Sequence, residues 1–589
     1  MNKKNNDTYI LGINAYHGDS SACILKNGKL IAAAEEERFN RKKHWAGFPT
    51  KAIKYCIMEA SISFDDIKHV AINSNPKSNL IKKIFYLFYR GQSFKFFIDR
   101  FKNKYKRIQI HSELLREFDS QKLNFQMHYI DHHLAHMASA YYASPFQEAI
   151  VLSVDGFGDF SSGSWGVASK NTIDVKKRIY FPHSLGVFYQ AITQFIGFPN
   201  YGDEYKVMGL APYGKDKFLN KMREIVKLNN DGSYTLNLKY FVHHNTKVDY
   251  RWNDGSPVVG KLFSDELANL LGVQHRNQYE EISQVHKDIA HSAQKMYEEA
   301  FFHMLNKIQN KYKCSNLALS GGCAMNSVAN GKIYSNTLFK EVYIQAAAGD
   351  AGGAVGAAYE VARRLNLISR DSEMSHAYWG PKFSKDYIAN LLNKNLDKLG
   401  NEDFTIQSFK NMNDIYIKTA SAIASGKVIG WFQGRMEWGP RALGNRSIIG
   451  DPRRKDMKDI LNLKIKRRES FRPFAPSILR ESVSDWFETD SDVPFMMQVF
   501  QIKEEKRSLI PAVTHVDGSG RLQTVTEESN KRYYLLIKEF KDLTGVPILL
   551  NTSFNENEPV VCSPDEALET FMRTKMDVIV LENFFISRN

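Results

Sequence analysis

His132 and His136 are the residues whose types and spacing first suggest chemistry. Residues at i and i+4 lie on one face of a helix, so a helix here places both imidazoles on the same side. Asp155 follows the hydrophobic run at 149–154, which predicts a buried strand with this carboxylate at its end. Imidazoles combined with carboxylates suit iron(II), zinc or manganese better than magnesium. These residues predict a metal site, and a merely packed or solvated histidine pair is the alternative.

Neighbouring residues support the metal interpretation and narrow it. Asp131 stands beside the pair, and Asp350 lies in a distant run of small residues. A zinc-protease motif is excluded, because the glutamate that should follow the first histidine is replaced by His133.

Glycine-rich turns recur at 12–21, 155–159, 320–326 and 347–356. Their backbone N–H groups can cradle phosphates, so together they predict a nucleotide site, although any single turn could be structural. There is no Walker A sequence and no strict G-x-G-x-x-G, which disfavours P-loop and Rossmann sites. The strand–turn–strand pattern at 9–25, with an Asn27-Gly28 hairpin after it, is repeated at 149–168. This repetition indicates the two halves of an actin/hexokinase-like domain.

Arginines in the C-terminal part stand among glycine, proline and aromatic residues rather than among lysine and glutamate. The guanidinium group of an arginine in such surroundings usually binds a phosphate or a carboxylate through two hydrogen bonds. The alternative is that these arginines form ion pairs within the protein and bind no ligand. A strand within 546–555 ends in hydroxyl and amide groups, a typical place for ligand contacts. The candidates are Arg441, Arg446, Arg453, Arg472, Arg521, Asn551 and Ser553.

Length and composition bound the class of protein. The 589 residues are too many for one core and suggest two to four domains, with a polar linker at 365–405. A content of 43% hydrophobic and 24% charged residues is ordinary for a soluble enzyme. The five cysteines lack C-x-x-C spacing, and neither a signal peptide nor an apolar run of about 18 residues is visible. We therefore expect a reduced, cytoplasmic protein.

The net charge of +14 is concentrated in a basic aromatic segment at 77–117, which holds eleven Lys/Arg against three Asp/Glu. We interpret this segment first as a helical insertion whose aromatic residues pack inward. The alternative is a binding segment, whose partner could be an anionic membrane surface, an acidic glycan or a nucleic acid. No RNA-recognition motif is present, so no nucleic acid partner is expected. A peripheral membrane contact and a homodimer stay open.

The motifs together resemble the ATP-dependent O-carbamoyltransferases of the nodulation-protein-U and cephalosporin/aminoglycoside-tailoring type. The resemblance extends through nearly the whole chain and is most specific at 434–446. Its carriers are 12–21, 131–136, 155–159, 206–214, 320–326 and 434–446. The family implies an α/β protein with an actin/hexokinase-like (ASKHA) N-terminal domain, here 1–365, and an α+β YrdC-like C-terminal domain, here 366–589.

By this resemblance, the second domain cleaves carbamoyl phosphate and joins the carbamate to ATP, giving carbamoyl-adenylate and pyrophosphate. The first domain then transfers the carbamoyl group to a hydroxyl of a glycan or secondary metabolite, assisted by a metal. The implied small molecules are ATP with magnesium, carbamoyl phosphate as co-substrate, and iron(II), zinc or manganese.

The resemblance also assigns roles to individual residues. The implied metal ligands are His132, His136, Asp155 and Asp350. His17 is the implied base for the acceptor hydroxyl, with a structural loop histidine as the alternative, and Lys42 or Lys43 is a basic residue on the 38–49 loop. Carbamoyl phosphate or the ATP phosphates are held by Arg441, Arg472 and Arg521, with Ser553 beside them. The further nucleotide candidates are Asp155, Gly156, Gly158, Lys206, Gly321, Gly322, Asn326, Gly352, Gly353, Arg446, Arg453 and Asn551. Lys206 pairing with Asp203 or Glu204, and Asn326 starting a helix, are the structural alternatives.

Two other functions compete with O-carbamoyl transfer. A threonylcarbamoyl-type tRNA-modifying enzyme is favoured by the basic charge and opposed by the arginine-rich block. A non-catalytic ATP-binding scaffold predicts that the histidine pair and the arginines are dispensable. Nucleotide binding by a fold does not distinguish these functions by itself.

Overall fold

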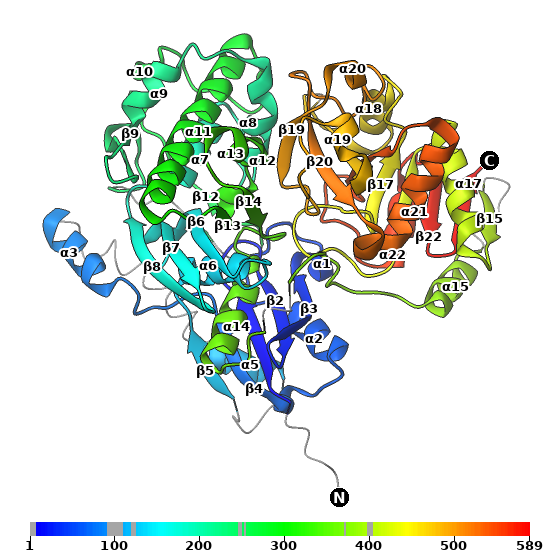
Figure 1. The fold of residues 1–589 in the computed structure, drawn as a ribbon, viewed down its shortest axis with the longest axis horizontal. Coiled ribbons are helices and arrows are strands. Elements are labelled where there is room, and N and C mark those ends of the chain that lie inside the picture. The colour runs from blue at the N-terminus through cyan, green and yellow to red at the C-terminus, as the bar shows by residue number, and fades with distance from the viewer. Residues whose placement is uncertain are drawn as a thin grey trace, which may run out of the picture. The chain divides into compact units, whose positions relative to one another are not determined.

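The computed structural model describes residues 7–90, 110–118, 125–245, 250–251, 255–369, 373–396, 404–469 and 471–589. Contacts divide the chain into two compact units: unit 1 comprises 1–329 and 333–374, and unit 2 comprises 330–332 and 375–589. Much of the basic aromatic segment, residues 91–109, lies outside the described residues. Each unit is a mixed α/β structure (Figure 1).

Unit 1 contains two five-stranded sheets with the same plan. The first has the order β3-β2-β1-β4-β5 and the second β14-β13-β6-β7-β8. In each sheet three consecutive strands pair antiparallel, β1 to β3 in the first and β6 to β8 in the second. Two further strands then extend the sheet in parallel beside the first of these three. The strands are β1 (Tyr9–Asn14), β2 (Ser21–Lys26), β3 (Lys29–Glu35), β4 (Ile67–Ile72), β5 (Gln126–Tyr129), β6 (Glu148–Gly158), β7 (Ser161–Ser169), β8 (Thr172–Tyr180), β13 (Asn316–Ser320) and β14 (Glu341–Ile344). The predicted hairpins at 9–34 and 149–168 are confirmed.

One expectation about the second sheet is wrong. Asp155 does not end its strand, because β6 continues to Gly158. The pairing of β6 with β7 shifts between Val154 and Gly158, so an irregularity in the ladder lies at Asp155. Such irregularities re-aim side chains, and this one places the carboxylate beside the helix that follows β5.

Helices cover both sheets of unit 1. Helix α14 packs on β1, β2 and β4 and on α6, while α6 also packs on β6 and β13. The small residues of α14 allow this close approach, since a Cβ on Gly356 would lie 1.8 Å from the Ala135 carbonyl oxygen. The helices are α1 (Glu37–Asn40), α2 (Thr50–Glu59), α3 (Leu80–Arg90), α5 (Ile110–Glu117), α6 (His132–Tyr141), α7 (Leu185–Phe195), α8 (Glu204–Leu210), α9 (Leu219–Ile225), α10 (Asp265–Leu271), α11 (Gln284–Tyr312), α12 (Ser327–Gly331), α13 (Ile333–Asn336) and α14 (Gly352–Arg364).

Unit 2 is built on a nine-stranded sheet of the order β15-β23-β22-β16-β17-β21-β18-β20-β19. Helix α21 packs on β18, β20 and β21, and α22 packs on β16 and β22. The strands are β15 (Phe404–Ser408), β16 (Ile429–Phe432), β17 (Arg446–Gly450), β18 (Ala475–Leu479), β19 (Gln498–Gln501), β20 (Ser519–Val525), β21 (Ile548–Ser553), β22 (Val578–Leu581) and β23 (Phe584–Arg588). The helices are α15 (Lys385–Lys394), α17 (Met412–Ala424), α18 (Met457–Leu461), α19 (Val483–Trp486), α20 (Glu504–Arg507), α21 (Glu527–Thr544) and α22 (Pro564–Arg573).

The stretch expected to be a linker contains helix α15. The helix forms there because its N-cap Ser384 accepts a hydrogen bond from the Tyr387 N–H, and because Leu391 and Leu392 are buried. Across the described parts of the chain, no helix combines the length and the apolar character needed to cross a bilayer.

Candidate functional site

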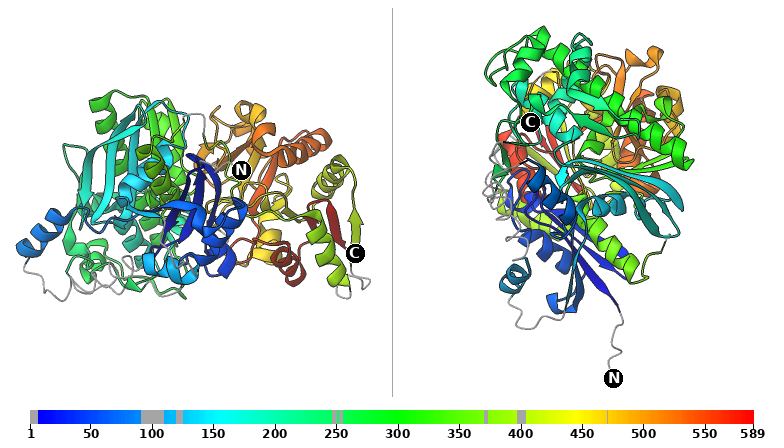
Figure 2. Two further views of the ribbon diagram at one scale, coloured as in Figure 1. Left: turned by 90° about the horizontal axis from the view of Figure 1, so that it is seen from below. Right: turned by 90° about the vertical axis from the view of Figure 1, so that its left-hand side faces the viewer.

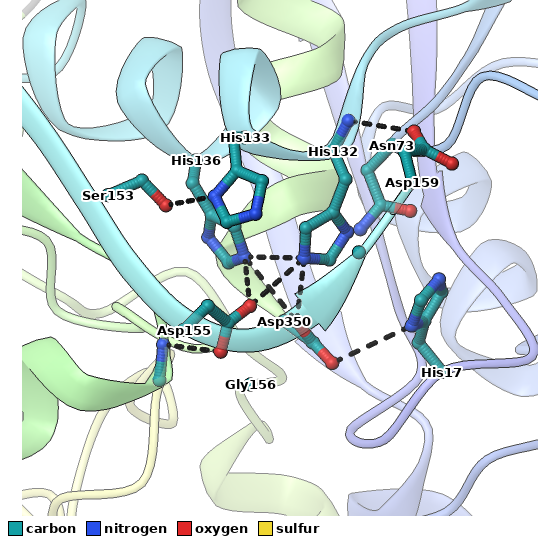
Figure 3. A network of polar contacts seen from close by, with 12 residues as sticks. His17, Asn73, His132, His133, His136, Ser153, Asp155, Gly156, Asp159 and Asp350 are labelled. Atoms are coloured by element: carbon teal, nitrogen blue, oxygen red, sulfur yellow. Dashed lines mark hydrogen bonds and ion pairs between the residues drawn. The ribbon is translucent and has the colours of Figure 1, made fainter. Parts of the chain in front are cut away.

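The histidine pair meets two carboxylates in unit 1 (Figure 3). His132 and His136 lie on the first turns of α6, which begins at the N-cap Asp131, and their Nε2 atoms are 3.1 Å apart. Asp155 Oδ2 lies 3.0 Å and 3.2 Å from these two nitrogens. Asp350 Oδ1 lies 3.5 Å and 3.4 Å from them. The four side chains therefore converge on one point from α6, β6 and the turn before α14.

This geometry fits a divalent cation. Metal–ligand bonds of about 2.0–2.2 Å place neighbouring donor atoms roughly 3.0–3.5 Å apart, which is the spacing found here. Burial, together with the negative charge of Asp155, raises the pKa of Asp350, although the hydrogen bond from His136 opposes this. Burial alone would lower the pKa of His136, but its hydrogen bonds to Asp155 and Asp350 raise it to about 9. A cation between the two carboxylates removes their mutual repulsion.

Neighbouring groups hold these side chains in place. The Asp159 carboxylate accepts a hydrogen bond from the His132 backbone N–H at 3.0 Å. The Asp155 Oδ1 atom accepts one from the Gly322 N–H at 3.0 Å. His17 is buried, and its Nδ1 lies 3.8 Å from Asp350 Oδ2, at the edge of the cluster. The structure thus brings the predicted base and the predicted metal ligands together.

The middle histidine of the motif has a different role. His133 is fully buried, and its Nδ1 lies 2.9 Å from the Ser153 hydroxyl. Burial, reinforced by the charge of His132, lowers the pKa of His133 to about 3, so its ring is neutral. His133 is a core residue that anchors α6 to β6.

Gly158 is required by the packing of His132. A Cβ at Gly158 would lie 2.0 Å from His132 Cδ2, whereas a Cβ at Gly156 would have no atom within 4 Å. The two glycines therefore form a matched pair for mutation.

We expect Gly158→Ala to displace the His132 ring, lower metal affinity by at least about tenfold and destabilise the fold by about 1–3 kcal/mol. Gly156→Ala is expected to change neither quantity measurably. Metal titration and thermal denaturation of both variants test this expectation. Equal metal affinity in the two variants would show that the His132 position does not control the site.

Several of the predicted nucleotide contacts have structural partners in unit 1. Lys206 Nζ pairs with Asp203 at 3.0 Å, and the Asn326 side chain exchanges hydrogen bonds with Gln294 and caps the start of α12. A Cβ at Gly353 would lie 2.3 Å from Asn73 Nδ2, so this glycine serves the packing of α14. The contacts of Lys206, Asn326 and Gly353 correspond to the alternative in which these residues support the fold and do not contact a nucleotide.

The other glycines and the loop lysine are placed as follows. A Cβ at Gly352 would lie 2.1 Å from the Ala347 carbonyl oxygen, and Gly321 has a φ of 92° beside the backbone of Val154. Lys42 is exposed, and its Nζ lies 5.2 Å from the centre of the Trp45 ring. The roles assigned to these residues stay predictions.

Unit 2 contains a cluster of arginines, which we call the arginine cluster and define as Arg441, Arg468, Arg472 and Arg521. The side chains of Arg441 and Arg521 hydrogen bond to none of the described residues, and the Nε of each is buried. Burial and the charge of Arg472 lower the pKa of Arg441 to about 10. The pKa of Arg521 falls well below its ordinary value through burial and through repulsion by the other three members. Such an excess of positive charge is the electrostatic requirement of an anion site.

Two of the predicted arginines do not take part in this cluster. Arg446 is fully buried, stacks on Phe432 and donates hydrogen bonds to the carbonyls of Gln433, Gly434, Asn445 and Pro381. Arg453 makes a two-pronged ion pair with Asp451, with Nη2 2.7 Å from Oδ2. Both side chains brace loops, which corresponds to the alternative that these arginines make internal contacts instead of binding a ligand.

The strand β21 places Ser553 and Asn551 in different surroundings. Asn551 is buried and donates hydrogen bonds to Ala442, Ser477 and Gln523, so it orders the strand behind the Arg441 loop. Ser553 Oγ lies 3.3 Å from the Nζ of the buried Lys466.

Lys466, Arg468 and His515 were not anticipated from the sequence. Lys466 ends a π-helical turn at Asn462–Lys466, and its Nζ also donates to the Asn555 side chain at 2.7 Å. His515 Nε2 is buried without a partner among the described residues, and burial with the charge of Arg521 lowers its pKa to about 4 although Asp517 opposes this. The one local signal is the basic run at 464–468, which resembles an ordinary solvated surface. A π-helical turn is frequent at functional sites, but this turn is seen only in the folded structure.

The fold and these two groups of residues define an α/β protein with a histidine–carboxylate cluster in unit 1 and the arginine cluster in unit 2. A family model described as "Carbamoyltransferase N-terminus" matches residues 9–359, and one described as "Carbamoyltransferase C-terminus" matches residues 420–588. The chain belongs to the carbamoyltransferase family and is a transferase.

Relatives of similar length support this assignment. The uncharacterized protein sll1178 of Synechocystis sp. is 39% identical over 99% of this chain and 97% of its own length. The nodulation protein NolNO of Sinorhizobium fredii is 34% identical over 98% of this chain and 80% of its own length. Among solved structures, HypF of T. kodakarensis shares 17% identity with a TM-score of 0.32, covering 62% of this chain and 50% of HypF.

Proposed function

We propose that this protein is an ATP-dependent O-carbamoyltransferase that forms carbamoyl-adenylate from carbamoyl phosphate and ATP and passes the carbamoyl group to an acceptor hydroxyl. The arginine cluster carries this proposal, because positive charges without carboxylate partners at Arg441 and Arg521 match two phosphorylated substrates. The duplicated sheets of unit 1 support an actin/hexokinase-like domain, and we assign unit 2 to the YrdC-like class.

In the first half-reaction, water cleaves carbamoyl phosphate to carbamate and inorganic phosphate, and a carbamate oxygen attacks the α-phosphate of ATP. Pyrophosphate leaves, and the O–P bond of carbamoyl-adenylate forms. The chain contributes arginines that neutralise the phosphates, together with Lys466 at the end of its π-helical turn and Ser553 at the end of β21, which contact each other. Carbamate is unstable in water, so this site must also keep the intermediate from solvent.

In the second half-reaction, the acceptor oxygen attacks the carbamoyl carbon and AMP leaves. His17, whose Nδ1 lies 3.8 Å from Asp350 Oδ2 at the edge of the histidine–carboxylate cluster, accepts the hydroxyl proton. A divalent ion held by these four side chains supplies a Lewis acid for the carbamoyl carbonyl, and iron(II), zinc or manganese suits the donor set. A glycan or a secondary metabolite is the proposed acceptor.

The test is release of pyrophosphate and AMP from ATP with no acceptor present. We expect release only when carbamoyl phosphate is added. Release that instead needs threonine and bicarbonate would move the function to tRNA modification. Nucleotide binding without release in either mixture, with or without an acceptor screen, would favour a non-catalytic scaffold.

A further inference from the structure

Helix α3 turns four of its apolar side chains outward. Leu80, Ile81, Ile84 and Phe85 expose 46%, 78%, 43% and 70% of their surface. At about 100° per residue, these four positions fall within roughly 140° of the helix circumference and form one stripe. We call this stripe the α3 face. In Figures 1 and 2 the helix stands out from the rest of unit 1.

The opposite side of α3 holds the helix against unit 1. The Tyr86 ring packs on Phe160 and Phe181, with ring centres 5.8 Å and 5.2 Å apart. Asn79, just before the helix, donates a hydrogen bond to the Asp159 carbonyl at 2.8 Å. The outward direction of the α3 face therefore follows from packing on the other side of the helix. The inward packing of the Tyr86 ring agrees with the expected helical insertion, whereas Phe85 faces outward, and the aromatic residues between 91 and 109 lie outside the described residues.

Four large apolar side chains that are exposed side by side mark an interaction surface. The described sequence that contains this stripe, residues 77–90, carries four Lys/Arg and no Asp or Glu. A second copy of the chain would bring the same positive charge and be repelled. An anionic phospholipid surface offers both an apolar interior for the stripe and the opposite charge for the lysines.

We propose that α3 docks this protein peripherally on an anionic phospholipid bilayer, with the α3 face inserted at the boundary between headgroups and acyl chains. The helix lies in the plane of the interface, since its cationic flank must stay with the headgroups. This docking is independent of the proposed chemistry, which uses none of these side chains.

The test is co-sedimentation of the full chain with vesicles of phosphatidylcholine alone or mixed with phosphatidylglycerol. We expect binding to the mixed vesicles, weakened at least about tenfold on phosphatidylcholine alone or at high salt. The double variant Ile81→Glu/Phe85→Glu is expected to bind at least about tenfold more weakly than the native chain. Leu338→Glu, at a position of unit 1 that is 74% exposed, is the matched control and should bind like the native chain.

Three results would overturn the proposal. The first is no binding of the native chain to the mixed vesicles, which would assign the α3 face to a protein partner. The second is unchanged binding by the double variant while its thermal unfolding matches the native chain. The third is concentration-dependent self-association in light scattering that the double variant abolishes, which would assign the face to a second copy.

Discussion

Arg521→Gln is expected to reduce carbamoyl-phosphate-dependent pyrophosphate release by about 10²–10³-fold. The substitution removes a cation of the proposed anion site and leaves a shorter, uncharged polar side chain. Arg521 hydrogen bonds to none of the described residues, and its pKa is depressed by burial and by the neighbouring arginines. Its removal relieves repulsion, so we also expect the ligand-free fold to gain about 1 kcal/mol. A coupled pyrophosphate assay and thermal denaturation measure the two effects.

The combination of lost activity and unchanged or improved stability distinguishes a binding residue from a structural one. Arg467→Gln is the matched control, because this neighbouring arginine is 72% exposed and should behave like the native chain. Inorganic phosphate should raise the melting temperature of the native chain more than that of Arg521→Gln. A parallel loss of stability and activity in Arg521→Gln would show that the cluster serves the fold.

His132→Ala is expected to lower metal affinity by more than about 10²-fold and to abolish carbamoyl transfer. It removes one of two nitrogen donors and leaves two carboxylates and a single imidazole on the site. Pyrophosphate release should partly persist, because that step is assigned to the arginine cluster. Elemental analysis of the purified protein and separate assays of the two half-reactions test the division.

His133→Asn provides the control for this experiment. His133 adjoins His132 in the sequence but contacts Ser153 in the core, so its loss should cost about 1–3 kcal/mol of stability without emptying the metal site. If His132→Ala abolished pyrophosphate release and spared transfer to an acceptor, the assignment of the half-reactions to the two units would be reversed.

Local patterns predicted the elements on which the metal site depends. The i, i+4 spacing of His132 and His136 is a property of one helix, and Asn27-Gly28 is a property of one turn. Neither depends on distant residues, so both could be predicted without the rest of the fold. The sequence offered Asp350 as a further carboxylate and the family resemblance made it a metal ligand, but no local pattern could place it beside this helix, since its position is 214 residues from that of His136.

The arginines show where prediction from the sequence ends. Arg441, Arg446 and Arg453 stand in similar glycine- and proline-rich surroundings, yet only Arg441 joins the arginine cluster and the other two brace loops. Arg446 reaches the carbonyl of Pro381, 65 residues away in the sequence, and Arg453 turns back to Asp451. A long cationic side chain takes whichever acceptor the fold brings within reach, and that choice is not visible in its neighbours along the chain.

From the sequence one could predict the duplicated strand–turn–strand pattern, the shared helical face of His132 and His136, and three members of the arginine cluster. Which glycines serve packing, which arginines lack a carboxylate partner and which way the apolar stripe of α3 faces became clear from the folded chain alone. The physical reason is range: hydrogen-bonded turns and helical faces depend on residues a few positions apart. Partner choice and burial depend on contacts between residues far apart in the chain.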